Sequence, residues 1–347
     1  MGIKNSIHIK LVILLLIFPC MAKAQDVDVK GIVLEHLKDS YSWHVTDIGK
    51  KHLSIYLPII VMDNNGTWHV FSSSHLEHGK SYEGFSIAHE GKYEGKVVTE
   101  QGAEHIRPRI DISITKNALS LFINCTILLL IIIPLARWYR GGTMKAPGGF
   151  RGMIELVIEY VNNEIIVPCV GEDHRKFSPI LLTLFFFILV SNLMGLIPIF
   201  PTGANLTGNI TITVTLAFCT FLATNLSGTK AYWKEILWPE VPTWLKVPLP
   251  IMPAIELLGI FTKPFALMIR LFANIFAGHA VILGLVSIVF ITATMGAAIS
   301  TGMTVVSVFF GVFMLFLELL VAFVQAYVFT LLSSVFIGMA RIKHEHH

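Results

Sequence analysis

The chain has 347 residues, of which 54% are hydrophobic and only 14% are charged, whereas soluble domains carry about 25% charged residues. This composition excludes an ordinary soluble protein and predicts a membrane protein with a smaller soluble part. The formal net charge of +3 is too small to indicate nucleic-acid binding, and no basic run supports that function.

The chain begins with a pattern typical of export signals. Lys4 and Lys10 precede an apolar run over residues 11–18, and residues 22–24 (AKA) have the small-x-small pattern of a cleavage site. We therefore predict a secretory signal peptide over residues 1–24. The alternative is a first membrane anchor, but the apolar run is too short to span a bilayer.

Residues 25–116 are polar and rich in histidine and glycine, and we predict a small extracytoplasmic α+β module there. Residues 32–43 are predicted to form a short helix. Two β-rich runs flank Asn65-Gly66, which is a strong hairpin signal. Residues 109–115 (RIDISIT) are predicted to form a final strand.

The histidines of this module lack the close spacing of metal ligands, so solvated or structural roles are favoured over the alternative of a metal site. They are His36, His44, His52, His69, His75, His78, His89 and His105. The module contains no cysteine, and a disulfide framework is therefore excluded.

Five long apolar segments follow, and each is predicted to span the membrane as a helix. They cover about residues 118–136, 180–200, 211–227, 255–289 and 305–337. The intervening residues 150–166 are amphipathic, which predicts a helix along the membrane surface. The expected fold is an all-α polytopic membrane domain over residues 117–347, with its last two helices long and packed antiparallel.

Lysine and arginine predict the orientation of the five spans. These residues occur in the connections after the first and third segments and in the C-terminal tail, whereas residues 201–210 and 290–304 contain none. By the positive-inside rule, the C-terminus is cytoplasmic and the N-terminal module lies outside. The odd number of spans agrees with a cleaved signal peptide.

Polar residues within the spans are the candidate functional residues, because charges in hydrocarbon are costly. The candidates are Lys263, Arg270, Asn274 and His279 in the fourth segment and Glu318 and Gln325 in the fifth. At about 100° per residue, Asn274 lies near the face of Arg270. His279 lies on the opposite face, about 13–14 Å further along the helix axis.

The predicted orientation places His279 and Glu318 in one outer layer of two antiparallel helices. That pair indicates a proton or cation path, because imidazole titrates near neutrality and a carboxylate can relay a proton. The alternative is a pair that only locks two helices together. Arg270 and Gln325 share a central layer, and since Gln325 is neutral, Arg270 needs a buried carboxylate on another chain.

Two other candidates have alternative interpretations. Lys263 lies near the inner boundary, where a snorkelling side chain is the simplest interpretation. Asn274 either lines a water path or hydrogen-bonds backbone. No phosphate-binding loop, zinc-binding HExxH helix or nucleophile elbow occurs, so we expect no cofactor and no catalysis by the chain itself.

Three stretches resemble subunit a of the F-type ATP synthase. RLFANIFAGH (270–279) and LLVAFVQAYVFTLLS (319–333) are similar to the signature helices of that family, and residues 191–217 resemble a third region of it. The resemblance covers about residues 117–342. The N-terminal extension lies outside the shared part, although HLKDSYSWHVTD (36–47) is similar to the start of subunit a in Bacteroidetes-type bacteria.

The resemblance implies a stator subunit that couples proton flow to rotation in a bacterial inner membrane, with a periplasmic N-terminal module. Arg270 would meet the buried carboxylate of each c subunit in a rotating ring, favour its deprotonation and block leakage between two half-channels. The implied partners are the c-ring, the b subunits of the peripheral stalk, the F1 sector indirectly, and the lipid bilayer. The alternatives are a non-rotary ion channel, a secondary transporter or an intramembrane hydrolase.

The resemblance also implies roles for the other candidates. His279 and Glu318 would carry protons from outside, and Gln325 and Asn274 would orient the arginine or its water. Asn205 is a further channel candidate. Two departures from the family occur: the acid and imidazole positions are exchanged relative to many bacterial members, and Ala266 replaces a frequent serine.

Overall fold

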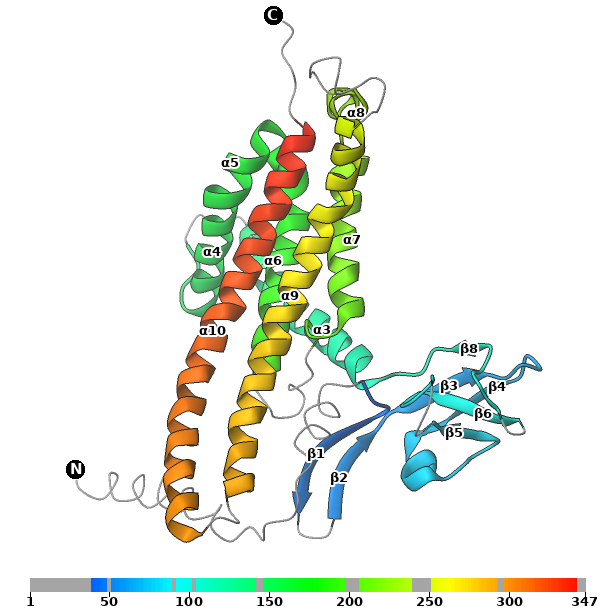
Figure 1. Cartoon of the computed structure of the whole chain (residues 1–347). Helices are drawn as coiled ribbons and strands as arrows, with labels where there is room; N and C mark the ends of the chain where they lie inside the picture. Colours follow the sequence, from blue (N-terminus) through cyan, green and yellow to red (C-terminus); the bar gives the residue numbers. More distant parts are fainter. Residues whose placement is uncertain are drawn as a thin grey trace, which may run out of the picture. The chain divides into compact units, whose positions relative to one another are not determined.

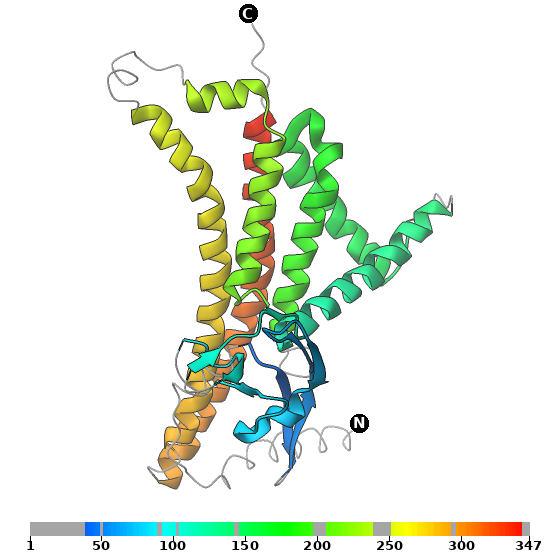
Figure 2. The same cartoon turned by 90° about the vertical axis from the view of Figure 1, so that its right-hand side faces the viewer.

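The computed structural model describes residues 39–48, 51–88, 92–101, 104–141, 146–196, 206–238, 251–292 and 296–341. These residues form two compact units (Figures 1 and 2). One unit contains the N-terminal strands and the first long helix, within residues 38–158 and 190–206. The other contains most of the remaining helices. The predicted signal peptide and Asn205 lie outside the described residues.

The described part of residues 39–115 is built mainly from short strands. They are β1 (Ser42–Ile48), β2 (Lys51–Tyr56), β3 (Pro58–Met62), β4 (Trp68–Ser72), β5 (Phe85–Ile87), β6 (Val97–Gln101), β7 (Glu104–Ile106) and β8 (Ile110–Asp111). They form three antiparallel sheets in the orders β1-β2, β4-β3-β8 and β5-β6-β7. A 3₁₀-helix, η2 (Ser73–Gly79), follows β4.

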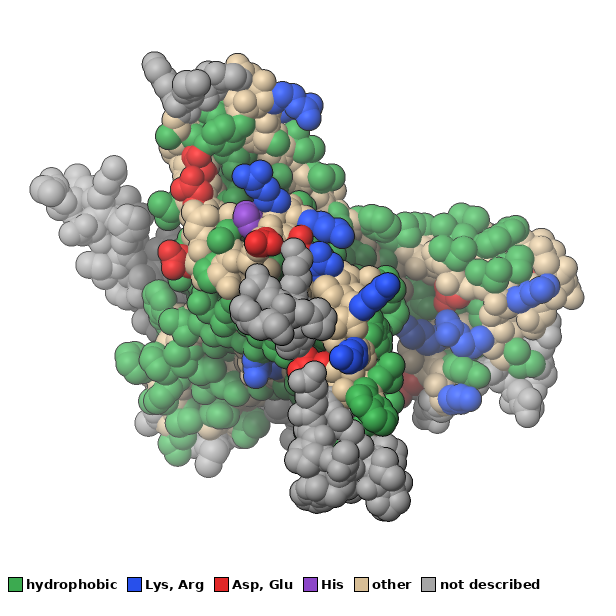
Figure 3. Space-filling view, turned by 90° about the horizontal axis from the view of Figure 1, so that it is seen from above, with side chains coloured by type: hydrophobic (Ala, Val, Ile, Leu, Met, Phe, Trp, Pro, Cys, Tyr) green, Lys and Arg blue, Asp and Glu red, His purple; other side chains and the backbone are tan. Residues whose placement is uncertain are grey.

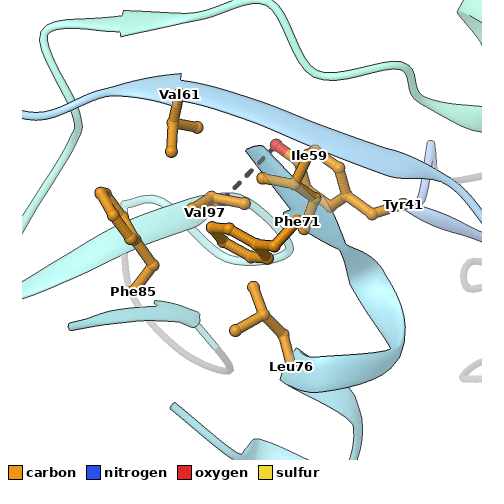
Figure 4. Close-up of a cluster of buried hydrophobic side chains, with 7 residues drawn as sticks. All are labelled: Tyr41, Ile59, Val61, Phe71, Leu76, Phe85 and Val97. Atoms are coloured by element: carbon orange, nitrogen blue, oxygen red, sulfur yellow. Dashed lines mark hydrogen bonds between the residues drawn. The ribbon is translucent and has the colours of Figure 1, made fainter. Parts of the chain in front are cut away.

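The core of this module forms because alternate residues of β3 point inward. Ile59 and Val61 are fully buried there, and they pack with side chains from the neighbouring elements (Figure 4). The full cluster is Tyr41, Ile59, Val61, Phe71, Leu76, Phe85 and Val97. Burial, followed by the nearby Asp111, raises the pKa of Tyr41, so its hydroxyl remains protonated and donates to the Asp111 carboxylate at 3.1 Å.

The predicted hairpin is confirmed, and the predicted final strand (109–115) is confirmed in part, since β8 covers two of its seven residues. β3 and β4 pair antiparallel across Asp63–Gly66, where Gly66 has the positive φ of 86° that glycine adopts without strain. The helix predicted over residues 32–43 is wrong at its end, because Ser42 and Trp43 belong to β1 and pair with β2. Residues 32–38 lie outside the described residues.

The helices follow in chain order. They are α3 (Lys116–Arg140), α4 (Phe150–Val161), a π-helical turn η3 (Asn162–Ile166), α5 (Val167–Val170), a 3₁₀ turn η4 (Gly171–Asp173), α6 (His174–Leu196), α7 (Ile210–Leu226), α8 (Lys230–Leu237), α9 (Ile251–Thr292) and α10 (Ala297–Arg341). Four described helical segments are long and apolar enough to cross a membrane, or five if α7 and α8, bent by 101°, form one span. The predicted mostly helical, polytopic membrane protein is therefore confirmed in outline.

The last two helices are unusually long. α9 has 42 residues and α10 has 45, which correspond to about 63 and 67 Å, or roughly twice the thickness of the hydrocarbon core. The two helices pack against each other, and α7 packs against both (Figures 1 and 2). They run antiparallel, with the start of α9 and the end of α10 at the same end of the helical unit (Figure 1).

The C-terminal half of α10 presents small residues to its neighbours, which allows close helix packing. Ala326, Ser333 and Ala340 are fully buried, and the Ser333 and Thr220 hydroxyls are 3.1 Å apart. At the end of α10, Arg341 donates to the Asp173 carboxylate at 2.7 Å and to the Ser227 carbonyl at 3.1 Å. These contacts join α10 to η4 and to the end of α7.

We predict that Gly338→Ala destabilises this packing. A Cβ at residue 338 would overlap the carbonyl oxygen of Cys169, and overpacking of this kind costs about 1–3 kcal/mol. The melting temperature of the purified protein should fall. Gly311→Ala, on the same helix with open space around it, is the matched control and should leave the melting temperature unchanged or raise it. Equal behaviour of the two variants would contradict the close contact.

Candidate functional site

An imidazole and a carboxylate face each other between α9 and α10. The Nδ1 atom of His279 lies 3.8 Å from Oε1 of Glu318, and the two side chains are only 15% and 10% exposed. Nδ1 also donates to the Ile275 carbonyl at 3.1 Å. Within the described residues, Oε1 of Glu318 is buried and accepts no hydrogen bond. The structure thus brings one acid and one imidazole together inside the helix packing.

Gly278 creates the space for the carboxylate. A Cβ at this position would lie 2.5 Å from Oε1 of Glu318, so a side chain on α9 would displace the acid. Helical periodicity and hydropathy do not single out this glycine. The available signal was a pair of small residues, Ala277 and Gly278, directly before a polar residue in a span.

Arg270 and Asn274 lie together on the other face of α9, as the helical angle predicts. Both are exposed, while the opposite face is buried and comprises Leu267, Met268, Leu271 and Ile275. Among the residues that the structure describes, Arg270 forms no hydrogen bond or ion pair. The guanidinium therefore faces outward, on a helix surface that it shares with the Asn274 amide.

Gln325 does not pair with Arg270. The amide is 6% exposed on α10, and no hydrogen bond within the described residues joins it to the guanidinium. It shares the buried face of α10 with Glu318, as their seven-residue separation predicts, while the exposed face carries Leu319, Leu320, Phe323 and Val324. His279 and Glu318, which are predicted to share one layer, thus lie together. Arg270 and Gln325 are predicted to share another, but the guanidinium is exposed and the amide is buried.

Lys263 lines a pocket between α7, α8, α9 and α10. Its Nζ lies 5.6 Å from the centroid of the Phe336 ring, so the half-buried ammonium makes a cation–π contact. The polar lining comprises Thr220, Thr224, Asn225, Tyr232 and Lys263. The Tyr232 hydroxyl donates to the Asn225 amide oxygen at 3.3 Å. Sequence spacing could not assemble this set, since it comes from three helices.

The module histidines that can be placed have ordinary partners. Nδ1 of His69 lies 2.6 Å from a Glu83 carboxylate oxygen, and His75 donates to the Ser72 carbonyl. In the described part of the chain, no group of three or more His, Cys, Asp or Glu residues could hold a metal ion.

Basic side chains gather at one end of the helical unit. Arg175 and Lys176 lie at the start of α6, Lys230 and Lys234 lie on α8, and Arg341 ends α10. Figure 3 looks onto this end and shows Lys and Arg side chains there. The described residues at the opposite ends of α7, α9 and α10 carry no lysine or arginine.

Known proteins provide an independent comparison. The family model "ATP synthase A chain" matches residues 118–338, and a "Domain of unknown function (DUF8433)" matches residues 32–112. The ATP synthase subunit a of Chloroherpeton thalassium is 42% identical over 68% of this chain and 69% of its own length. The ATP synthase subunit a 2 of Prosthecochloris aestuarii is 39% identical over 80% of this chain and 86% of its own.

Fold and site thus define a polytopic membrane protein with ionisable groups held between and on two long packed helices. The chain belongs to the ATP synthase A chain family, as the resemblance predicts. That family is a non-catalytic membrane subunit, so the expectation that the chain is not itself an enzyme is confirmed.

We predict that Gly278→Ala displaces the Glu318 carboxylate and lowers the melting temperature, because the added methyl group and the acid compete for one space. In a Glu318→Ala background the same change should have little effect, since the acid is gone. In double-mutant cycles of this kind, residues in contact show coupling energies of about 0.5–3 kcal/mol. Gly284→Ala, which enters open space on the same helix, is the control. Equal effects of Gly278→Ala in both backgrounds would contradict the steric account.

Proposed function

We propose that this chain is the proton-translocating stator subunit of an ATP synthase membrane sector. It would lie in a bacterial inner membrane, with its C-terminus in the cytoplasm and its N-terminal module in the periplasm. Membership of the ATP synthase A chain family supports this function, and the basic residues at one end of the helical unit support the orientation. The observation that carries the proposal is Arg270, which faces outward and has no partner among the described residues.

An arginine in hydrocarbon costs at least about 2.5–3.5 kcal/mol without a partner. Because Arg270 projects from the exposed face of α9 and is unpaired within the described residues, its carboxylate partner is best sought on another chain. A ring of c subunits would bring one buried carboxylate after another past this position. Arg270 would lower the pKa of each arriving carboxyl group and favour loss of its proton.

The outer access path would lead to His279 and Glu318. Beyond this pair, toward the end of α9 and the start of α10, buried hydroxyls line the two helices: Ser287, Thr292, Thr304 and Ser307. The Ser307 hydroxyl donates to the Leu285 carbonyl across the helix pair at 2.5 Å. Such hydroxyls can support a water chain from the outer surface to the imidazole. The acid–imidazole pair would then pass protons to the ring.

The inner path would leave at the opposite end of α9. The pocket around Lys263 lies seven residues before Arg270, about 10 Å along the helix, and its hydroxyl, amide and phenol groups can hold water. Asn274 shares the arginine's face, and Gln325 lies on α10; both would orient the arginine or its water. The offset between the two paths makes Arg270 the barrier to direct leakage.

The proposed partners are the c-ring, the b subunits of the peripheral stalk and, indirectly, the F1 sector, and no cofactor is required. Each proton that crosses would deliver about 2.3 kcal/mol per 100 mV to rotation. The alternatives, a non-rotary channel or a secondary transporter, need no ring. Co-purification with an oligomeric ring of small two-helix proteolipids distinguishes them from the rotary function.

We predict that Arg270→Ala abolishes ATP-driven proton pumping while the complex still assembles. An unpaired buried carboxylate costs about 3–5 kcal/mol, so pumping in inverted membrane vesicles should fall by about 100-fold or more, and passive proton leakage should rise. Ile269→Ala, at the adjacent exposed apolar position, is the control and should retain pumping. Full coupled activity in Arg270→Ala would refute the proposed role.

We also predict that exchanging the acid and the imidazole is better tolerated than either single change. The double variant His279→Glu with Glu318→His keeps one acid and one imidazole at the same depth. Each single variant leaves two like groups facing each other at 3.8 Å. Dye-monitored pumping should therefore be higher in the double variant. A double variant no better than the worse single would indicate that the two residues act separately.

A further inference from the structure

One sheet of the N-terminal module has an apolar outer face. The β3–β4 and β3–β8 registers align its outward-pointing residues in three rows across the strands. The rows are Trp68, Met62 and Ile110; Val70, Ile60 and Ile112; and Ser72, Pro58 and Ile114. Every position except Ser72 is apolar, and none is charged. We call these nine residues the outer sheet face.

The inner face of the same sheet is mixed: Ile59, Val61 and Phe71 belong to the module core, and His69 and Asp111 lie in the same row as Val61. Asp111, which lies between Ile110 and Ile112, points inward and accepts a hydrogen bond from the Tyr41 hydroxyl. A sheet with one face in water carries polar residues on that face. This sheet has the composition of one that is covered on both sides.

Among the residues that the structure describes, none covers the centre of the outer sheet face. Val70 is 68% exposed, Ile112 59% and Trp68 51%. Figure 3 shows hydrophobic side chains gathered over the module. Soluble monomers rarely expose contiguous apolar patches of this kind, and such patches mark contact with a partner or a membrane.

The last strand of the sheet continues without a linker into α3, a membrane-spanning helix. The amide of Ile112 donates to the Ile60 carbonyl, that of Ile114 to the Pro58 carbonyl, and that of Lys116 to the Ser40 carbonyl. α3 begins at Lys116, capped by the Thr115 hydroxyl. The sheet and the first turn of α3 are therefore held as one continuous hydrogen-bonded piece.

This continuity limits how far the outer sheet face can lie from the bilayer. Lys116 follows Ile110 by six positions, which is at most about 20 Å of extended chain. Ile112 and Ile114 are nearer still. Trp68 suits the boundary between headgroups and acyl chains, where tryptophan is enriched in membrane proteins. Arg109, exposed beside Ile110, suits contact with lipid phosphate.

We propose that the outer sheet face is a membrane-docking surface that rests on the headgroup–acyl boundary of the bilayer entered by α3. The lipid bilayer is the occupant because the face is tethered at its surface and carries no polar pattern that would select a particular protein. Docking fixes the module against the membrane and orients the first turn of α3. The inference is independent of proton translocation and would hold if that function failed.

Spin labels on the full chain test this surface. The assembled complex is reconstituted in vesicles of phosphatidylethanolamine and phosphatidylglycerol, after Cys20, Cys125, Cys169 and Cys219 are replaced by alanine. A label at Val70→Cys reports on the outer sheet face. A label at Lys80→Cys, an exposed position at the end of η2, is the matched control. Power saturation compares collisions with oxygen, which partitions into lipid, and with a water-soluble nickel chelate.

The ratio of oxygen to nickel collisions should be several-fold higher at residue 70 than at residue 80. A label at Ile112→Cys should behave like that at residue 70, and it serves if the first variant folds poorly. A nickel-accessible label at residue 70 means that the face is in water, and this overturns the proposal. Low collision rates with both reagents mean that protein covers the face, whether another subunit, a second copy or another segment of this chain, and this overturns it as well.

Discussion

A charge in hydrocarbon must be paired with an opposite charge or hydrated. Most of the described architecture depends on how the chain satisfies this requirement for its ionisable groups. Glu318 has a titratable neighbour within the chain, because His279 lies opposite it and Gly278 leaves room for the carboxylate. Arg270 does not, since it projects from the exposed face of α9 without a partner in the described residues. Glu318 thus lies between α9 and α10, whereas Arg270 is accessible to a neighbouring chain. In the proposed mechanism this division separates the access path from the rotor surface.

Arg270 stays at a fixed depth only if α9 is held rigidly. The small residues of α10 allow the close packing that does this. Ala322 and Ala326 are fully buried near Gln325, Gly338 meets the Cys169 carbonyl, and Arg341 binds η4 and α7 together. Close packing of this kind stabilises helices in lipid, where the hydrophobic effect does not favour one helix contact over another. Large apolar side chains therefore lie on the outward faces of both helices, as Leu319 and Phe323 do on α10.

Features set by local spacing could be predicted from the sequence. Hydropathy located the five long apolar segments, whose predicted bounds differ from the ends of α3, α6, α7, α9 and α10 by one to eight residues. The Asn65-Gly66 turn identified the β3–β4 hairpin, and helical periodicity placed Arg270 and Asn274 on one face and His279 on the other. Features set by contacts across elements could not be predicted. The role of Gly278 depends on a residue of α10, the Lys263 pocket draws on several helices, and the β1 strand needed β2 as its pairing partner, which is why a helix was wrongly expected there.

The final strand shows why alternation alone is insufficient. RIDISIT alternates isoleucine with polar residues, and such a pattern normally turns the isoleucines toward the core. Here the core is already filled by β3, β4, β5 and β6, and Asp111 is needed inside to accept the Tyr41 hydroxyl. The isoleucines therefore face outward, where water would oppose them and a bilayer would not. Because the strand continues directly into α3, the proposed docking and the entry of α3 into the membrane have the same physical origin, which is apolar surface leaving water where the chain first reaches lipid.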